Sequence, residues 1–126
     1  MLVVDDDPLV ASVVARALAD YDVHVELNGR TAVRRVEAGE AFDLLLCDIM
    51  MPEMNGIEVH AAVCRADPAL GVRTVFMTGG VFNEIVRSFL EGVPNRRLAK
   101  PFTLRELRLI CASALAQADE DERTLG

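Results

Sequence analysis

The feature that most constrains the fold is a regular alternation between short apolar runs and longer segments with helical periodicity. The apolar runs cover residues 2–4, 23–27, 42–47, 73–77 and 96–99. Between and after them, apolar residues recur three to four positions apart, which predicts helices at 8–20, 31–38, 57–66, 82–91 and 103–117. Strands and helices that alternate through short loops require a mostly parallel sheet with helices on both faces. We therefore expect an α/β fold with five strands and five helices.

Local signals support these boundaries. Asp7 followed by Pro8 is typical of a helix N-cap and first turn, and Gly39 is placed to end the second helix. Thr103 and Glu106 have the spacing of a capping box before the last helix. Residues 42–47 show almost no alternation of polar and apolar side chains, so we expect this strand to be covered on both faces.

Composition limits the chain to about one domain and argues against some functions. The chain has 126 residues, of which 52% are apolar, enough for a buried core. Its net charge of -7 argues against a nucleic-acid partner, because phosphate backbones require clustered lysines and arginines. Ordinary acidic solubility and a gathering of acids around a cation both fit this charge.

The sequence also indicates the cellular location of the protein and the extent of its domain. The three cysteines, Cys47, Cys64 and Cys111, lie in apolar stretches, which is typical of reduced core residues in a cytosolic protein. Without a signal peptide or a run near the ~20 residues of a membrane span, we expect a cytoplasmic chain with no direct membrane contact. We assign residues 1–118 to the domain and 119–126 to an acidic C-terminal tail, and expect no DNA-binding or enzymatic output domain to follow.

Polar side chains follow four of the five predicted strands. They are the carboxylates of Asp5, Asp6, Asp7 and Asp48, the hydroxyl of Thr78 and the ammonium of Lys100. In an open parallel sheet, ligands bind outside the carboxyl ends of the strands, so we expect these groups to converge. Two carboxylates ~4 Å apart repel by about 4 kcal/mol at an effective dielectric constant of ~20, and a cation must offset this. The all-oxygen ligand set favours a hard cation such as Mg2+.

This combination of groups suits phosphoryl transfer. A carboxylate can attack phosphorus while a metal ion neutralises the developing charge, and an ammonium and a hydroxyl hold the remaining oxygens. Lys100 carries a further argument, because the chain contains twelve arginines and this one lysine. A single lysine at a strand end that faces acids indicates a need for the compact ammonium group.

Several charged residues have structural interpretations as well. Asp7 is better explained as an N-cap than as a metal ligand. The pairs Arg34-Arg35 and Arg96-Arg97 are interpreted as solvated edges, with partner contacts as the alternative. His24 and His60 fall far from the acids, and we interpret them as surface residues rather than phosphohistidines.

Four segments then stand out in their order and spacing: Val-Val-Asp-Asp-Asp at 3–7, the stretch 43–56 with Asp48, Pro52 and Gly56, Phe-Met-Thr-Gly at 76–79, and Lys-Pro-Phe at 100–102. Over essentially its whole length the chain resembles the receiver domains of response regulators and hybrid histidine kinases. A lone Asp-Asp or Lys-Pro pair would mean little, but the joint pattern is highly specific. We expect a flavodoxin-like three-layer sandwich with a five-stranded parallel sheet in the order 2-1-3-4-5.

The resemblance implies a role for each residue at the predicted metal site. Asp48 would be the phosphorylated residue and would also contact Mg2+. Asp5 and Asp6 match the acidic pair that holds the ion, the second directly and the first through water. Met50 would contribute only its backbone carbonyl.

The resemblance also implies how the phosphoryl group is held and how the site is shaped. Thr78 and Lys100 would each contact a phosphoryl oxygen, and Thr78 would move toward it on activation. The peptide bond between Lys100 and Pro101 would be cis. Pro52 and Gly56 would shape the loop after Asp48, with Gly56 at a backbone angle that other residues tolerate poorly.

The sequence departs from the family pattern near the site. Three residues before the lysine the family commonly has Tyr or Phe, where this chain has Arg97, so the aromatic switch of the family is in doubt. An arginine cannot fill the same apolar slot without burying a charge. Met50 and Gly80, which flank the predicted phosphorylation site, offer no side-chain amide or acid to position an attacking water. We expect slow self-dephosphorylation.

The implied function is a step in a two-component phosphorelay. The chain would accept a phosphoryl group from a phosphohistidine on a histidine kinase or histidine phosphotransfer protein, and would switch conformation to regulate a partner or fused kinase. We expect a phosphoprotein without substrate turnover, as a monomer or weak dimer. The stretches 77–81 and 93–102 look like receivers at the C-terminus of hybrid sensor histidine kinases, and a free-standing regulator is the alternative.

The competing class is a Mg2+-dependent phosphohydrolase with an aspartyl nucleophile on a related sheet. Such enzymes usually have a second acid two residues after the nucleophile, where this chain has Met50, and a cap insertion for which there is no room. A degenerate receiver that only binds a partner fits poorly, because no position of the predicted site is missing.

Overall fold

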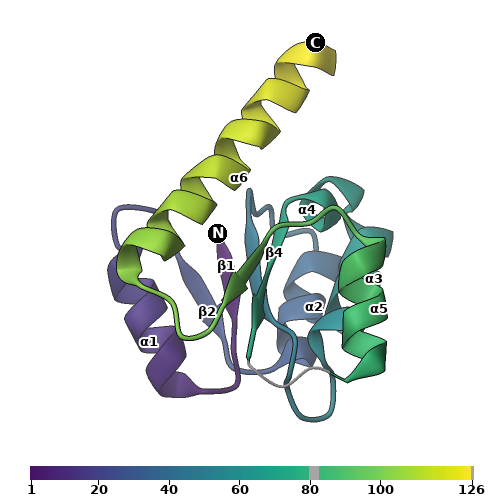
Figure 1. The fold of residues 1–126 in the computed structure, drawn as a ribbon. Helices are drawn as coiled ribbons and strands as arrows, with labels where there is room; N and C mark the ends of the chain where they lie inside the picture. The colour runs from purple at the N-terminus through teal and green to yellow at the C-terminus, as the bar shows by residue number, and fades with distance from the viewer. Residues whose placement is uncertain (80–82, 126) are drawn as a thin grey trace.

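The centre of the fold is a five-stranded parallel sheet (Figure 1). The computed structural model describes residues 1–79 and 83–125, with the side chains of the last helix described through Gln117. The strands are β1 (Leu2–Val4), β2 (His24–Glu26), β3 (Leu45–Asp48), β4 (Thr74–Thr78) and β5 (Arg97–Ala99). Their order is β2-β1-β3-β4-β5 and each neighbouring pair is parallel, which confirms the predicted topology.

Helices cover both faces of this sheet, which gives the predicted three layers (Figure 1). Within the described ranges they are α1 (Pro8–Ala17), α2 (Gly29–Glu37), α3 (Gly56–Ala66), α4 (Pro68–Val72), α5 (Glu84–Gly92) and α6 (Leu104–Leu125). On one face, side chains of α1 and α6 such as Val14 and Leu107 share a core with Leu46 of β3. On the other face, side chains of α2 and α3 share a core with Leu45 and Cys47. Strand β3 is therefore buried on both faces, as its lack of alternation predicts.

The number of helices differs from the prediction. Six helices are present among the described residues, because the short α4 follows α3 where we expected a loop. Asp67 ends α3 and also begins α4, since its carboxylate accepts a hydrogen bond from the Leu70 N–H at 3.2 Å. Pro68 then occupies the first position of α4. The Asp-Pro pair that we interpreted as a stop signal is also a start signal.

The last two helices also differ from the prediction at their ends. The start predicted at Phe82 lies outside the described residues, and α5 begins at Glu84 after its N-cap, Asn83. Helix α6 continues to Leu125, beyond the predicted end at 117, and projects past the sheet in Figure 1. Residues 118–125 contain no Gly or Pro to end a helix, which explains the extension. Across 1–79 and 83–125, no helix has the length and apolar character needed to span a membrane.

The predicted helix caps are present with one change. The Asp7 carboxylate accepts a hydrogen bond from the Leu9 N–H at 2.9 Å, and Gly39 has a φ of 91° just after α2. The Thr103 hydroxyl accepts from the Glu106 N–H at 3.0 Å. The Glu106 carboxylate accepts from the Thr103 hydroxyl at 3.2 Å rather than from its backbone, so Thr103 and Glu106 form half of a capping box.

Gly56 is required by close packing, and the backbone angle predicted for it was wrong. A Cβ at this position would lie 2.7 Å from the Asp48 carbonyl oxygen and 2.7 Å from the Ile49 Cα. The left-handed backbone in this loop is at Glu53 instead, with a φ of 66°. The missing side chain of Gly56 lets α3 begin directly against the backbone of β3.

We predict that Gly56→Ala lowers the free energy of unfolding by about 1–3 kcal/mol, because an added methyl group must displace backbone. Urea unfolding followed by circular dichroism measures this change. Gly92→Ala is the matched control, since a Cβ there meets no atom within 4 Å. The control should be neutral or stabilising by up to about 1 kcal/mol. Equal stability of Gly56→Ala and the wild type would contradict the packing argument.

Candidate functional site

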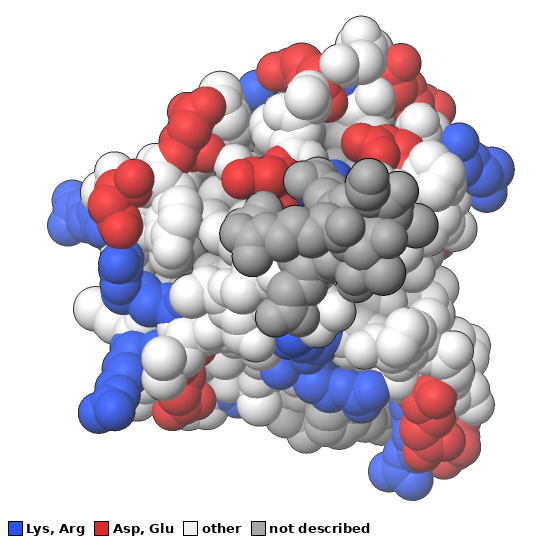
Figure 2. Space-filling view, turned by 90° about the horizontal axis from the view of Figure 1, so that it is seen from above, with Lys and Arg blue, Asp and Glu red and all other residues white. Residues whose placement is uncertain are grey.

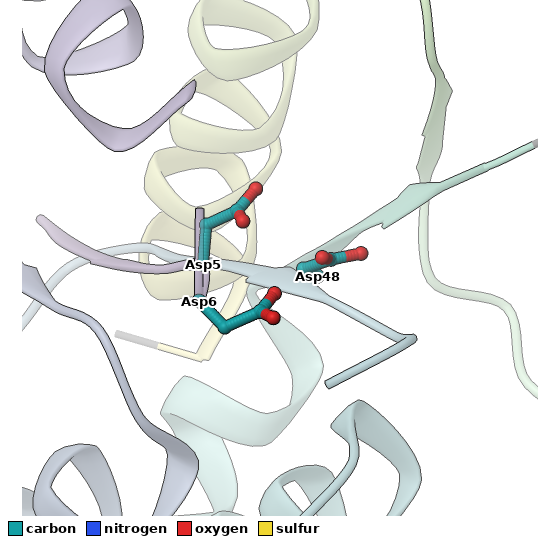
Figure 3. A group of neighbouring side chains, drawn as sticks. All are labelled: Asp5, Asp6 and Asp48. Atoms are coloured by element: carbon teal, nitrogen blue, oxygen red, sulfur yellow. The ribbon is translucent and has the colours of Figure 1, made fainter. Parts of the chain in front are cut away.

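Three carboxylates lie together at the C-terminal edge of the sheet (Figure 3). Asp5 and Asp6 directly follow β1, and Asp48 is the last residue of the neighbouring strand β3. One oxygen atom from each carboxylate lies within 4.8 Å of the others, and all three side chains project to the same side in Figure 3. The predicted convergence of acids is confirmed. Asp7, the fourth acid of the sequence pattern, is the N-cap of α1.

Asp5 and Asp6 have different surroundings although they are adjacent in sequence. Asp5 is 0% exposed, and both of its oxygens accept hydrogen bonds. The Asp7 N–H donates to one oxygen at 2.9 Å, and the Lys100 ammonium donates to the other at 2.8 Å. Asp6 is exposed. Asp5 is therefore held in place by protein donors, and Asp6 presents its carboxylate to solvent.

Asp48 is a nearly buried carboxylate that lies beside a second negative charge, the carboxylate of Asp5. It is 5% exposed, with one oxygen 3.4 Å from the Met50 N–H and the other 3.3 Å from the Lys100 ammonium. Burial, and then the charge of Asp5, raise the pKa of the Asp48 carboxyl above its ordinary value. Lys100 and the Met50 N–H act in the opposite direction but do not cancel these effects.

Lys100 is the cation of this cluster. Its ammonium contacts both Asp5 and Asp48, and its own backbone N–H donates to the Thr78 carbonyl at 2.7 Å. Burial lowers the pKa of Lys100, but the carboxylates of Asp5 and Asp48 outweigh this and raise it. The peptide bond between Lys100 and Pro101 is cis, as the resemblance implied. The lone lysine therefore lies among the acids, where the sequence argument placed it.

The remaining predicted site residues lie around the acids. Thr78 ends β4, beside β3, and is 4% exposed. Since Asp48 pairs with Met77, Thr78 lies one residue beyond the end of the β3–β4 pairing. Met50 follows Asp48 by two residues, and its side chain is 49% exposed. Gly80, which we expected to flank the site, lies outside the described residues.

The donor set fits a hard divalent cation. Asp5, Asp6 and Asp48 offer only oxygen ligands, and one ammonium does not balance three ionised carboxylates. Burial is the largest cause of the raised pKa of Asp48, and the negative charge of Asp5 adds to it. Mg2+ prefers carboxylate oxygens and retains waters where protein ligands are few, which suits a site with one exposed acid.

The two histidines lie away from these acids, but they are half-buried rather than surface residues. His24 begins β2, at the opposite end of the sheet, with Nδ1 3.0 Å from an Arg35 nitrogen. His60 in α3 has Nε2 3.0 Å from the Gly71 carbonyl oxygen, and its ring meets Phe76 edge to face at 5.2 Å. Figure 2 shows the end of the molecule opposite the site, where acidic and basic side chains are interspersed.

The arginine pairs are partly solvated, as expected, with specific contacts at two positions. Arg34 is exposed, whereas Arg35 is half-buried and forms ion pairs with Glu40 at 2.7 Å and Glu26 at 3.4 Å. Arg97 is exposed and does not enter the apolar layer, and a guanidinium nitrogen donates to the Leu90 carbonyl at 2.6 Å. An arginine at this position therefore makes a polar contact in place of an aromatic one.

The three cysteines are free thiols, and two of them lie in the core. Cys47 and Cys111 are buried, and Cys64 is half-buried. Burial raises the pKa of the Cys47 thiol, which favours its protonated form. The expectation of core residues is confirmed for Cys47 and Cys111, whereas Cys64 is only partly buried.

Comparison with known proteins agrees with this geometry. The model of the response regulator receiver domain family matches residues 1–112. The chain belongs to the response regulator receiver domain family. It is similar to the response regulator receiver protein CpdR of Brucella abortus, with 36% identity over 85% of this chain and 88% of that protein. It is also similar to the DNA-binding transcriptional regulator NtrC of Rhizobium meliloti, with 34% identity over 93% of this chain and 24% of that protein.

The fold of the receiver is also found among solved structures. A CheY-like response regulator receiver domain from Methanospirillum hungatei superimposes with a TM-score of 0.85 over 95% of both chains, at 24% identity. This likeness concerns the fold. The receiver spans about a quarter of the length of NtrC, so the activities of that whole protein do not carry over.

Sequence reasoning missed two contacts that position Asp5 in the receiver. The hydrogen bond from the Asp7 N–H joins residues two apart, and an Asp before a turn is a signal that could have indicated it. The bond from Lys100 joins residues 95 positions apart and depends on the tertiary fold. The sequence predicted that Lys100 faces the acids but not that it bridges Asp5 and Asp48.

We predict that Asp48→Asn stabilises the metal-free receiver at pH 7 by about 0.5–2 kcal/mol, as relaxation of a strained functional site often does. Because folding raises the pKa of Asp48, its ionised form opposes folding, and this effect fades as pH falls and Asp48 takes up a proton. Urea unfolding with a chelator at pH 7 and pH 4 measures the gain, which should shrink at pH 4. Glu37→Gln, which removes an exposed charge, should show no such gain.

A wild type more stable than Asp48→Asn at pH 7 would show that Lys100 fully compensates the buried carboxylate. A gain of the same size at both pH values would mean that ionisation of Asp48 is not its cause.

Proposed function

We propose that the receiver accepts a phosphoryl group on Asp48 and acts as a phosphorylation-controlled switch in a two-component relay. The observation that supports this most directly is the Lys100 ammonium placed between the nearly buried Asp48 and the buried Asp5. A cation in this place can leave one carboxylate for another acceptor when charge is added at Asp48. The exposed Asp6 at the same edge gives the site an opening to solvent.

The proposed step is a transfer from a phosphohistidine. A carboxylate oxygen of Asp48 attacks the phosphorus atom and forms a P–O bond as the P–N bond to the imidazole breaks. The electron pair of the broken bond returns to the imidazole nitrogen, which takes up a proton. The product is an acyl phosphate on Asp48. Burial and the charge of Asp5 raise the pKa of the Asp48 carboxyl, so added positive charge near it would favour the anionic form that reacts.

Each neighbouring residue has a role in this step. Lys100, 3.3 Å from Asp48, would turn its ammonium toward a phosphoryl oxygen, and the hydroxyl of Thr78 would donate to another. Asp5, Asp6, Asp48 and the carbonyl of Met50 would hold Mg2+. When bound, Mg2+ supplies positive charge that offsets the phosphoryl oxygens.

The partner implied by this chemistry carries a phosphorylated histidine. We infer that it is a histidine kinase or a histidine phosphotransfer protein, encountered in the cytoplasm. The receiver labels itself once and then changes its interaction with a partner or a fused domain, so we expect no turnover of a substrate. The relatives include both a separate receiver protein and a DNA-binding regulator, so a free-standing form and a fused form are both consistent with this proposal.

Incubation with acetyl phosphate and Mg2+, followed by intact mass measurement, tests the proposal. We predict that the wild type gains the mass of one phosphoryl group and that Asp48→Asn gains none. A chelator should prevent labelling of the wild type, and Glu37→Gln should label normally. Labelling of Asp48→Asn would contradict the assignment of the acceptor. Repeated turnover of a phosphate ester would instead favour a phosphohydrolase.

The side chain of Met50 bears on the lifetime of the acyl phosphate. Its exposed side chain lies next to Asp48 in the loop and has no group that could orient a water for attack on phosphorus. We therefore expect slow self-dephosphorylation, with hydrolysis several-fold faster in Met50→Asn. Loss of the phosphoryl mass over time measures the rate, with the exposed Glu53→Gln as a control of unchanged rate. A half-life of only seconds in the wild type would be evidence against this prediction.

A further inference from the structure

Arg97 lies on the face of β5 that is turned toward α5. Leu98, its neighbour in the strand, is buried in the cluster that contains Leu107 of α6, and successive strand residues point to opposite faces. In the parallel register, Arg97 pairs with Phe76 of β4, which packs against Val86 and other apolar residues of α5. The side chain of Arg97 therefore starts beside the strand surface on which α5 rests.

The guanidinium of Arg97 reaches the C-terminal turn of α5. One nitrogen donates to the Leu90 carbonyl at 2.6 Å, and Leu90 belongs to the last turn, whose carbonyls lack partners within a helix. At the end of α1, the N–H of Leu18 bonds to the Val14 carbonyl. After α5, Val93 is already extended, and Arg97 supplies the donor from another element. A cation is also favoured at this end of a helix.

The strands that meet α5 here are the same strands that end at the predicted phosphorylation site. Thr78 follows Phe76 by two residues on β4 and pairs with Ala99 of β5. Lys100 comes directly after Ala99, and its ammonium contacts Asp48. Helix α5 is thus joined to these strands by apolar contact, with the rings of Phe76 and Phe89 5.2 Å apart, and by the hydrogen bond of Arg97.

We propose that Arg97 is a positioning residue that couples α5 to the strand carrying Lys100, so that the last turn of α5 responds to the occupation of Asp48. This inference rests on the proposed function. A phosphoryl group on Asp48 draws the Lys100 ammonium away from Asp5. Because Lys100 directly follows β5, this change of contact alters the interactions that hold the end of β5. The hydrogen bond between Arg97 and Leu90 passes this change to α5. A polar link from a strand to a helix end here performs the coupling without a buried aromatic ring.

Hydrogen–deuterium exchange of the full chain, with and without beryllofluoride and Mg2+, tests the coupling. Without the phosphate mimic, Arg97→Gln should exchange the amides in the last turn of α5 about threefold to tenfold faster than the wild type, the effect of one net hydrogen bond. Addition of the mimic should alter exchange in this turn of the wild type, and most of that alteration should be lost in Arg97→Gln. Arg97→Lys, which keeps a cationic donor, should retain part of it.

Arg87→Gln is the matched control, because it removes an exposed arginine from α5 itself. It should behave like the wild type in both conditions. Acetyl phosphate labelling of each variant separates the two proposals. If the wild type takes no label, the proposed function fails and the coupling fails with it. If all variants label normally but the response of α5 in Arg97→Gln equals that of the wild type, the coupling alone is wrong.

Discussion

The receiver depends on holding the carboxylates of Asp5 and Asp48 close together at the ends of two neighbouring strands, although like charges at this distance repel. The Lys100 ammonium between them reduces the repulsion, and the buried strands β1 and β3 prevent the acids from separating. Gly56 lets α3 begin against the backbone that carries Asp48. The parallel sheet, its two apolar layers and the start of α3 thus all serve to keep this charge cluster in place.

An excess of negative charge makes the cluster sensitive to added charge. The pKa of Asp48 is raised because burial and Asp5 disfavour its ionised form more than Lys100 favours it. A divalent cation would relieve this imbalance, and a phosphoryl group would create a new one that, in the proposed function, Lys100 and Thr78 would meet. The same side chains therefore account for the proposed need for Mg2+, for the proposed reaction at Asp48 and for the proposed coupling through β5.

Much of the fold and the composition of the site could be predicted from sequence because they follow from local patterns. The unbroken apolar run at 42–47 indicated a strand covered on both faces, and polar residues after strands indicated a shared edge. Features that depend on tertiary packing could not be predicted. The role of Gly56 in close approach, the bridge from Lys100 to Asp5 and the bond from Arg97 to Leu90 each join segments that only the folded chain brings together. Asp67 shows a further limit of prediction from sequence. The Asp-Pro pair was interpreted only as the end of one helix, but it also begins the next.

A crystal structure of the receiver with Mg2+ and beryllofluoride tests the central claim most directly. If added charge at Asp48 reorganises the cluster, beryllium should be attached to an Asp48 oxygen, the metal should lie among Asp5, Asp6 and Asp48, and the Lys100 ammonium should have left Asp5 for a fluoride. A structure in which the mimic binds elsewhere, or in which Lys100 keeps its contact with Asp5 while Asp48 is occupied, would contradict this account of the site.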